Sequence, residues 1–163
     1  MKIKIEVSAE ERDEASVAGE GLDEVLRVVA SNPKSSQQML DAVSASKSRC
    51  VRMEAAGNPN ASLETLDKLI NDEEAEVRAA LTQHPDAIQF LWKLVSDRSA
   101  LVRYCVALNP TFPEHVYQVL SRDENERVAR RARRTLSDIR TRDSLVVKFM
   151  DSVKHKHDYR AAS

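Results

Sequence analysis

The chain has 163 residues, of which 42% are hydrophobic but only 4% aromatic, and its formal net charge at pH 7 is −1. This length is enough to bury one core without metals or disulfides, and that core must consist mainly of aliphatic side chains. The near-zero net charge gives no overall attraction to nucleic acid or to an anionic membrane. Three glycines are too few for an all-β domain with many tight turns.

The N-terminal segment is acidic. Its first 24 residues contain eight Asp or Glu residues against two lysines and one arginine. Ile3, Ile5 and Val7 alternate with polar residues as in a short strand, but a single strand has no partner. We therefore interpret residues 1–21 as a flexible acidic arm. It lacks the apolar run of a secretory signal, and no window is apolar enough to span a membrane, so we expect a cytoplasmic protein.

Residues 22–140 contain a tandem repeat of 25 to 26 residues. Asn-Pro, or His-Pro in one copy, recurs at Asn32, Asn58, His84 and Asn109. A segment that begins with valine precedes each dipeptide, and a fifth copy lacks the proline. Five segments at a nearly constant spacing of 25 to 26 residues are typical of a repeat protein. The segments begin at Val25, Val51, Val77, Val102 and Val128.

Each repeat predicts two short helices. The valine-led segment keeps apolar residues at helical spacing, as in Val77, Ala80 and Leu81, and the proline ends it because the preceding residue avoids helical backbone. The second helix is expected to begin at a capping box, Thr111–Glu114 or Asp86–Gln89. Helices shorter than about 12 residues are marginal alone. We therefore predict an all-α solenoid, in which each repeat is stabilised by its neighbours.

Charged residues recur in the same register. Arginine follows the valine at Arg52, Arg78 and Arg103, while Asp72 and Asp97 lie where the next valine-led helix starts and are expected to cap it. One interpretation is a structural ladder, in which each arginine binds such a carboxylate or helix-end carbonyl groups and fixes the stacking register. The other is a basic ladder that lines a groove.

The pattern Val-Arg-x-x-x-Ala-x-Asn-Pro, followed by spaced leucines and an Asp before the next Val-Arg, resembles the leucine-rich repeat variant family over residues 25–136. The stretches 72–78 and 97–103 are also similar to the second helix of HEAT repeats, of the armadillo-like class, although those repeats are longer. The resemblance implies a right-handed superhelix of about five two-helix repeats, with room for one 3₁₀ segment per unit. The iron–sulfur domain of the family's prototype has no counterpart, since no cysteine precedes the repeats.

The C-terminal end is basic. Seven arginines and one acid lie between Arg127 and Arg142. Arginines on one predicted helix face form either a solvated outer face or an anion-binding stripe for nucleic acid. These are Arg127, Arg130, Arg131 and Arg134. Residues 141–163 are expected to form a capping helix and a basic tail. Its apolar face either seals the last repeat or makes a dimer contact, and comprises Leu145, Val146, Phe149, Met150 and Val153.

Residues with chemical potential are few. The sequence has no Gly-rich phosphate loop, no GxSxG and no HExxH. Lysines beside His155 and His157 repel a cation, and Cys50 and Cys105 are interpreted as buried small apolar residues. Trp92 either packs in the core or lies at a groove edge, where it would contact a partner. We therefore expect no enzyme, no cofactor and no metal.

These patterns favour a non-catalytic interaction scaffold that binds a protein partner through one face of the solenoid. Nucleic-acid binding through the arginine-rich repeat is one alternative. Self-association through the oppositely charged ends is the other, so a homo-oligomer is an open outcome.

Overall fold

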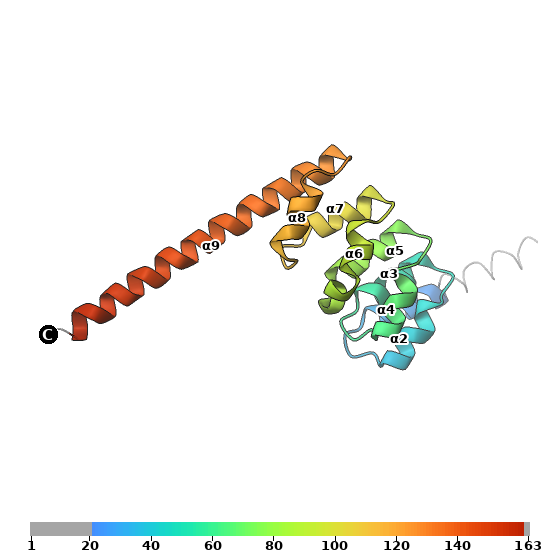
Figure 1. Ribbon diagram of the computed structural model, residues 1–163. Helices are drawn as coiled ribbons and strands as arrows, with labels where there is room; N and C mark the ends of the chain where they lie inside the picture. The colour runs from blue at the N-terminus through green and yellow to red at the C-terminus, as the bar shows by residue number, and fades with distance from the viewer. Residues whose placement is uncertain (1–20, 162–163) are drawn as a thin grey trace, which may run out of the picture. The chain divides into compact units, whose positions relative to one another are not determined.

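The computed structural model describes residues 21–161, with side chains as far as residue 148. Every regular element in this part of the chain is a helix, and no strand occurs in it (Figure 1). The predicted all-α class is confirmed. The chain divides into two compact units, Met1–Phe90 and Leu91–Ser163. The proposed arm lies outside the described residues, except for Gly21, which begins a helical stretch.

The first unit starts with helical residues 21–31 and continues through four α-helices and two 3₁₀ segments. These are α2 (Gln37–Ser44), α3 (Arg49–Gly57), α4 (Leu63–Leu69), α5 (Ala75–Ala80), η1 (Leu81–Gln83) and η2 (Pro85–Phe90). The valine-led helices α3 and α5 pack against each other, with Val51 and Val77 fully buried. Helix α3 ends just before Asn58, whose backbone is extended, as the following proline requires.

The second unit holds α6 (Leu91–Val95), α7 (Ala100–Leu108), α8 (Glu114–Leu120) and α9 (Glu126–Ala161). Helix α9 packs against both α7 and α8 and then continues past them (Figure 1). Its packed face carries Val128, Ala132, Thr135 and Ile139, all buried. These positions follow helical spacing, so one stripe of α9 faces the two shorter helices.

One turn recurs after the valine-led helices. The side chain before each repeat proline accepts the backbone N–H of the residue two positions later, which closes the turn around the proline. The four acceptors are Asn32 Oδ1, Asn58 Oδ1, His84 Nδ1 and Asn109 Oδ1. Histidine therefore replaces asparagine in the third copy without loss of this bond.

A second recurring bond joins neighbouring helix ends. Asn58 Nδ2 donates to the carbonyl groups of Ala30 and Asn32, at 2.7 and 2.9 Å. Thr135, which stands where the fifth copy lacks asparagine, donates its Oγ1 to the carbonyl of Ala107 at 2.7 Å. Asn58 reaches Ala30, and Thr135 reaches Ala107, across the same separation of 28 residues. The two units thus repeat one side-chain contact between successive valine-led helices.

The residues predicted to cap the helix N-termini are not the ones that cap them in the structure. Asp86 lies inside η2, and α8 begins after Pro113 without a side-chain cap. Asp72 and Asp97 accept the N–H two residues later, in the turn before the helix, rather than in the first turn itself. The observed side-chain caps include Ser36, Ser62 and Ser99, whose hydroxyl groups accept an N–H of the first helical turn, and Asn125, whose Oδ1 accepts those of Arg127 and Val128 at the start of α9.

Residues 141–163 do not form the separate capping helix that we expected. Helix α9 is unbroken from Glu126 to Ala161, because Thr135-Leu136 replaces Asn-Pro and no proline ends the helix. Residues 141–148 are all exposed, and Leu145 and Val146 are 60% and 56% exposed. This apolar face therefore does not seal the last repeat over the residues whose side chains are described, while Phe149, Met150 and Val153 lie outside that range.

Candidate partner-binding surface

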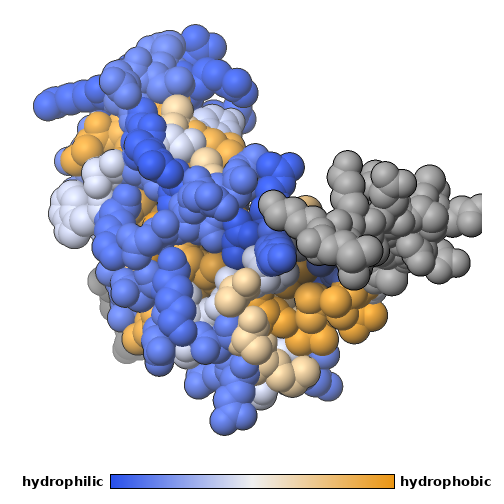
Figure 2. Space-filling view, turned by 90° about the vertical axis from the view of Figure 1, so that its right-hand side faces the viewer, coloured by the Kyte–Doolittle hydropathy of each residue, from blue (hydrophilic) through white to orange (hydrophobic). Residues whose placement is uncertain are grey.

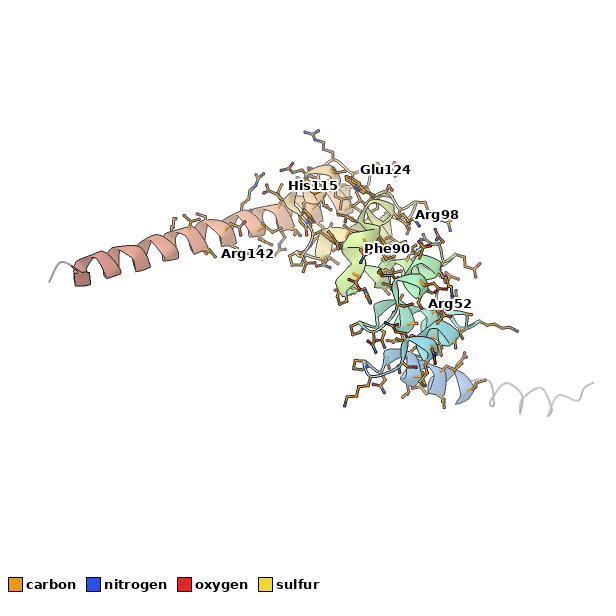
Figure 3. All side chains as sticks on the ribbon, turned by 60° about the horizontal axis from the view of Figure 1, so that its bottom comes forward. Arg52, Phe90, Arg98, His115, Glu124 and Arg142 are labelled. Carbon is orange, nitrogen blue, oxygen red and sulfur yellow. The ribbon has the colours of Figure 1, made fainter. Side chains whose placement is uncertain are left out.

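Arg52 and Arg103, the first and third of the repeated arginines, have largely buried side chains. Arg52 binds Asp72 with two hydrogen bonds, Nε to Oδ2 at 2.7 Å and Nη2 to Oδ1 at 3.1 Å. Arg103 binds Asp123 in the same way, at 2.7 and 3.0 Å. The two arginine side chains are only 11% and 10% exposed. Glu124, labelled in Figure 3 near the start of α9, also approaches Arg103 Nη2 at 3.3 Å.

The remaining ladder residues bind the backbone. Arg78 is buried and donates Nη1 to the carbonyl groups of Asp72 and Glu73, at 2.7 and 3.0 Å. Asp97 accepts the N–H of Ser99 at 2.7 Å, and its own carbonyl accepts from Arg103. Most N–H groups of these guanidinium groups therefore donate to a carboxylate or to a backbone carbonyl. These arginines therefore organise the helix starts and do not line an open groove.

The buried pairs keep their carboxylates ionised. Burial alone would raise the pKa of Asp72, but the hydrogen bonds from Arg52 and from the Glu74 N–H outweigh it and hold that pKa below its usual value. The hydrogen bonds from Arg103 likewise lower the pKa of Asp123 against the opposing effect of burial.

A different set of residues is left uncovered on α7 and α9. On α7 this set, called the apolar row, comprises Leu101, Tyr104, Cys105 and Leu108. On α9 it comprises Arg127, Arg130, Arg131 and Arg134, called the arginine row. Leu101 and Leu108 are 43% and 38% exposed, and the other members are exposed or half-buried. Each arginine follows its α7 counterpart by 26 residues. The two rows therefore occupy the same register on their helices.

Contacts at both ends place these rows side by side. The Arg127 guanidinium carbon lies 6.0 Å from the centre of the Tyr104 ring, near the start of α9. Further along, Thr135 bonds to the carbonyl of Ala107 near the end of α7. The two helices also pack directly against each other. They therefore run in the same direction, and the arginine row borders the apolar row along its length.

A concavity of about 200 Å³ lies where the two helices start, lined by Ala100, Leu101, Tyr104, Asn125, Arg127 and Val128. Its walls come from α7, from α9 and from the turn before α9. A larger hollow of about 530 Å³ runs along the exposed half of α9, near the Arg142 labelled in Figure 3. That hollow is lined by residues of α9 alone, so it is an open helix face without a second wall.

The charge of the arginine row is only partly balanced. Glu126 binds Arg133 at 2.8 Å and lies 3.9 Å from Arg130. Among the residues with described side chains, no carboxylate pairs with Arg127, Arg131 or Arg134. Arg131 also has a buried Nε without a hydrogen-bond partner. The exposed side chains of Arg127 and Arg134 therefore keep donors and positive charge available to a ligand.

Trp92 lies outside the core. It is 66% exposed on α6, and its ring centre is 6.2 Å from that of His115 on α8. This settles one alternative left open by the sequence, since the side chain does not pack in the core. Its role as a partner contact stays a prediction. On the face shown in Figure 2, hydrophobic residues form separate patches among hydrophilic ones.

The other candidate residues have structural surroundings. His84 is buried, and burial lowers its pKa; its Nε2 makes no hydrogen bond, although the nearby backbone of Asn58 favours the protonated ring. Cys50 is exposed and Cys105 is half-buried, so the expectation that both are buried was wrong for Cys50 and only partly met by Cys105. No group of three potential metal ligands occurs among the described residues, and His155 and His157 lie where side chains are not described.

The apolar and arginine rows were not recognised as one surface from the sequence. The sequence shows the arginines on one face of their own helix, but the periodicity of one helix does not show which neighbouring helix lies beside that face. The available signal was the 26-residue offset, because equivalent positions of successive repeats are neighbours in a stacked array.

Comparisons of the chain with protein-family models, with curated proteins and with solved structures find no match. In the part of the chain that the structure describes, no helix combines the length and the apolar character needed to cross a bilayer.

Proposed function

We propose that this chain is a non-catalytic scaffold that binds another protein along the apolar and arginine rows of α7 and α9. The observation that carries the proposal is the juxtaposition of these rows. Leu101 and Leu108 remain uncovered although apolar burial is favourable, and unneutralised arginines border them. Protein interfaces typically combine apolar and aromatic side chains with arginine in this way.

The same proposal includes the architecture, a right-handed α-solenoid of about five repeats related to the leucine-rich repeat variant and HEAT-like families. Contacts repeated within each unit support it. Arg52–Asp72 and Arg103–Asp123 span the same 20 residues, and the Asn58 and Thr135 bonds span 28. A solenoid repeats the same contact between each repeat and the next. The family relationship rests on the sequence pattern.

A non-catalytic role is favoured by what the repeated polar residues do. The ladder arginines bind carboxylates and carbonyl groups, and the Asn or His before each proline binds the backbone of its own turn. These repeated polar groups therefore stabilise the helix starts and the turns of the fold. The apolar and arginine rows are not used in this way, and their composition is that of a binding surface.

A protein partner fits the two rows better than nucleic acid. Phosphate contacts need the arginines but do not need the exposed aliphatic side chains of Leu101 and Leu108. Base stacking needs an open aromatic face, and Arg127 already lies over the ring of Tyr104. The apolar row thus has no use in a phosphate-binding site, whereas a protein partner would bury it.

Affinity capture of the full chain from cells that express it, followed by mass spectrometry, tests this function. The variant Leu101→Glu/Leu108→Glu places two charges in the apolar row, and Val119→Glu changes an exposed apolar residue of α8 outside it. We expect a set of proteins that the wild type and Val119→Glu retain and the double variant loses. If the double variant captures the same proteins as the wild type, the proposal is wrong.

Self-association is a second candidate, favoured by the arginines that lack an acidic partner and by the uncovered Leu145 and Val146. The acidic first 20 residues of another copy have a complementary charge. Sedimentation velocity at low and high salt would detect an oligomer held by charge. A monomer at all salt concentrations would remove this candidate and leave the protein-binding proposal untouched.

A further inference from the structure

The surface formed by the two rows is divided along its length into an apolar half and a cationic half. Leu101, Cys105 and Leu108 stand 26 residues before Arg127, Arg131 and Arg134, and the two helices that carry them pack against each other. A ligand that lies along the boundary would therefore meet aliphatic and aromatic groups on one side and guanidinium groups on the other. This arrangement selects for a ligand that is itself amphipathic.

The cationic half has few acidic partners of its own, and Glu126 reaches only Arg130 of the row. Among the described side chains, Arg127, Arg131 and Arg134 form no ion pair, and one carboxylate, Asp138, lies a helical turn beyond Arg134. The buried Nε of Arg131 has no hydrogen-bond partner. That nitrogen is closed to a ligand, but Arg127 and Arg134 are exposed and Arg131 is half-buried, so a ligand carboxylate can approach their guanidinium groups from outside.

The apolar half provides a place for one side chain. The concavity between the helix starts has a volume of about 200 Å³, and most of its wall is contributed by Ala100, Leu101, Tyr104 and Val128. Sites for whole small molecules usually measure roughly 300–1,000 Å³. The volume is therefore suited to a single aliphatic or aromatic side chain of a longer ligand, and Arg127 lines the same concavity.

The length of the arginine row sets the spacing of the charges. Arg127 and Arg134 are seven residues apart on α9, which at about 1.5 Å per residue corresponds to roughly 10 Å. An extended peptide rises about 3.3 Å per residue, so acids three positions apart span the same roughly 10 Å. A short segment is thus enough to reach both ends of the row.

We propose that the α7–α9 surface binds an acidic peptide segment that carries a bulky apolar side chain. The carboxylates bind Arg131 and Arg134, and the apolar side chain occupies the concavity beside Tyr104. This inference rests on the proposed function and specifies the chemistry of the partner. The positive charge of the arginine row favours an acidic ligand, and the apolar lining of the concavity favours an apolar side chain. Both features together favour an acidic peptide that carries such a side chain, whereas either alone would fit a broader class of ligand.

The test is a titration of the full chain by fluorescence anisotropy with three probes of equal net charge. The first is a labelled synthetic peptide rich in glutamate with leucines between the acids. The second has serine at each leucine position, and the third is a single-stranded oligonucleotide. We expect the leucine peptide to bind at least about tenfold more tightly than the serine peptide, because a leucine in the concavity removes apolar surface from water and a serine does not.

The double variant Arg131→Gln/Arg134→Gln should weaken binding of the leucine peptide by at least about tenfold, since charge-assisted hydrogen bonds are lost. Arg122→Gln removes an exposed arginine outside the row and should leave the affinity unchanged. Circular dichroism of both variants should match the wild type. Equal binding of leucine and serine peptides, tighter binding of the oligonucleotide, or an unchanged affinity in the double variant would overturn the inference.

The outcomes also separate this inference from the proposed function. If the leucine peptide does not bind but Leu101→Glu/Leu108→Glu still loses captured proteins, the surface binds a partner of another chemistry and only the inference fails. If neither peptide binding nor protein capture depends on the two rows, both fail.

Discussion

Arg103 and Asp123 form a two-bond ion pair that joins the first turn of α7 to the turn before α9, with Nε–Oδ2 and Nη2–Oδ1 distances of 2.7 and 3.0 Å. The same Arg103 donates Nη1 to the carbonyl of Asp97 at 2.7 Å. One side chain therefore ties together the starts of two successive valine-led helices. Arg52 does the same with Asp72 in the first unit.

Removal of Asp123 should be strongly destabilising. In Asp123→Ala the guanidinium of Arg103 would stay largely buried without its main partner, and breaking such a pair costs about 3–5 kcal/mol. The exposed Glu124 can replace only part of the interaction. Urea unfolding at pH 7 measures the loss, with Asp138→Ala as an exposed control that should change the free energy of unfolding by less than about 0.5 kcal/mol. A similar small effect for Asp123→Ala would contradict the structural role of the pair.

The same pairs predict a dependence of stability on acid pH. The pKa values of Asp72 and Asp123 are lower in the folded chain than the unfolded value of about 3.9. The unfolded chain therefore takes up protons first as the pH falls, so this stabilisation is full above about pH 5 and is lost through the folded pKa values. Thermal melts from pH 6 to pH 2 should show a falling Tm, with a smaller fall in Asp72→Asn/Asp123→Asn. Parallel pH curves for the wild type and the double variant would refute this assignment.

His84 predicts a second, separate transition near neutral pH. Because burial lowers its pKa in the folded state, the unfolded chain binds the proton more readily, so the stabilisation by neutral His84 is full above its unfolded pKa of about 6.5 and is lost as the pH falls from there through the lower folded pKa. His84→Asn should remove this loss, since asparagine keeps the turn bond that Asn58 and Asn109 make. Tm measured between pH 8 and pH 5 checks it, with His115→Asn as the exposed control. An undiminished loss of Tm in His84→Asn would show that another group is responsible.

Two leucines of the same helix should differ sharply in their contribution to stability. Leu66 on α4 is fully buried, whereas Leu63 is largely exposed. Leu66→Ala should cost about 2–5 kcal/mol, the usual range for a buried leucine, and Leu94→Ala on α6 should cost as much. Leu63→Ala should cost less than about 1 kcal/mol. Chemical denaturation of the three variants measures the difference, and equal losses for Leu63 and Leu66 would mean that α4 presents another face to the core.

The helices and their ends were predictable because local chemistry determines them. Valine, alanine and leucine at helical spacing mark the buried face, and the proline after Asn58 or Asn109 fixes where each helix stops. The serine caps also depend only on local sequence, but the capping-box pattern pointed to other residues. Ser62, directly before the leucines of α4, was the signal.

Other features depend on contacts that no single segment reveals. The apolar spacing of Leu145 and Val146 correctly indicates an amphipathic helix, but periodicity does not say what covers the apolar face. Asp72 was among the expected partners of the repeated arginines, but the assignment of Asp72 to Arg52, 20 residues away, follows from the packing of α3. Likewise, the sequence shows the arginine row on its own. That the apolar row of α7 borders it became evident only because α7 and α9 lie side by side in the structure.

The most direct test of a partner-binding surface on α7 and α9 is site-specific photo-crosslinking in cells that express the chain. A benzophenone amino acid is placed at Leu108 in the apolar row, and in a separate chain at Val119 on α8, which is also exposed. Our proposal predicts a discrete protein adduct from position 108 that is absent from position 119. No adduct from position 108, or the same adducts from both positions, would contradict it.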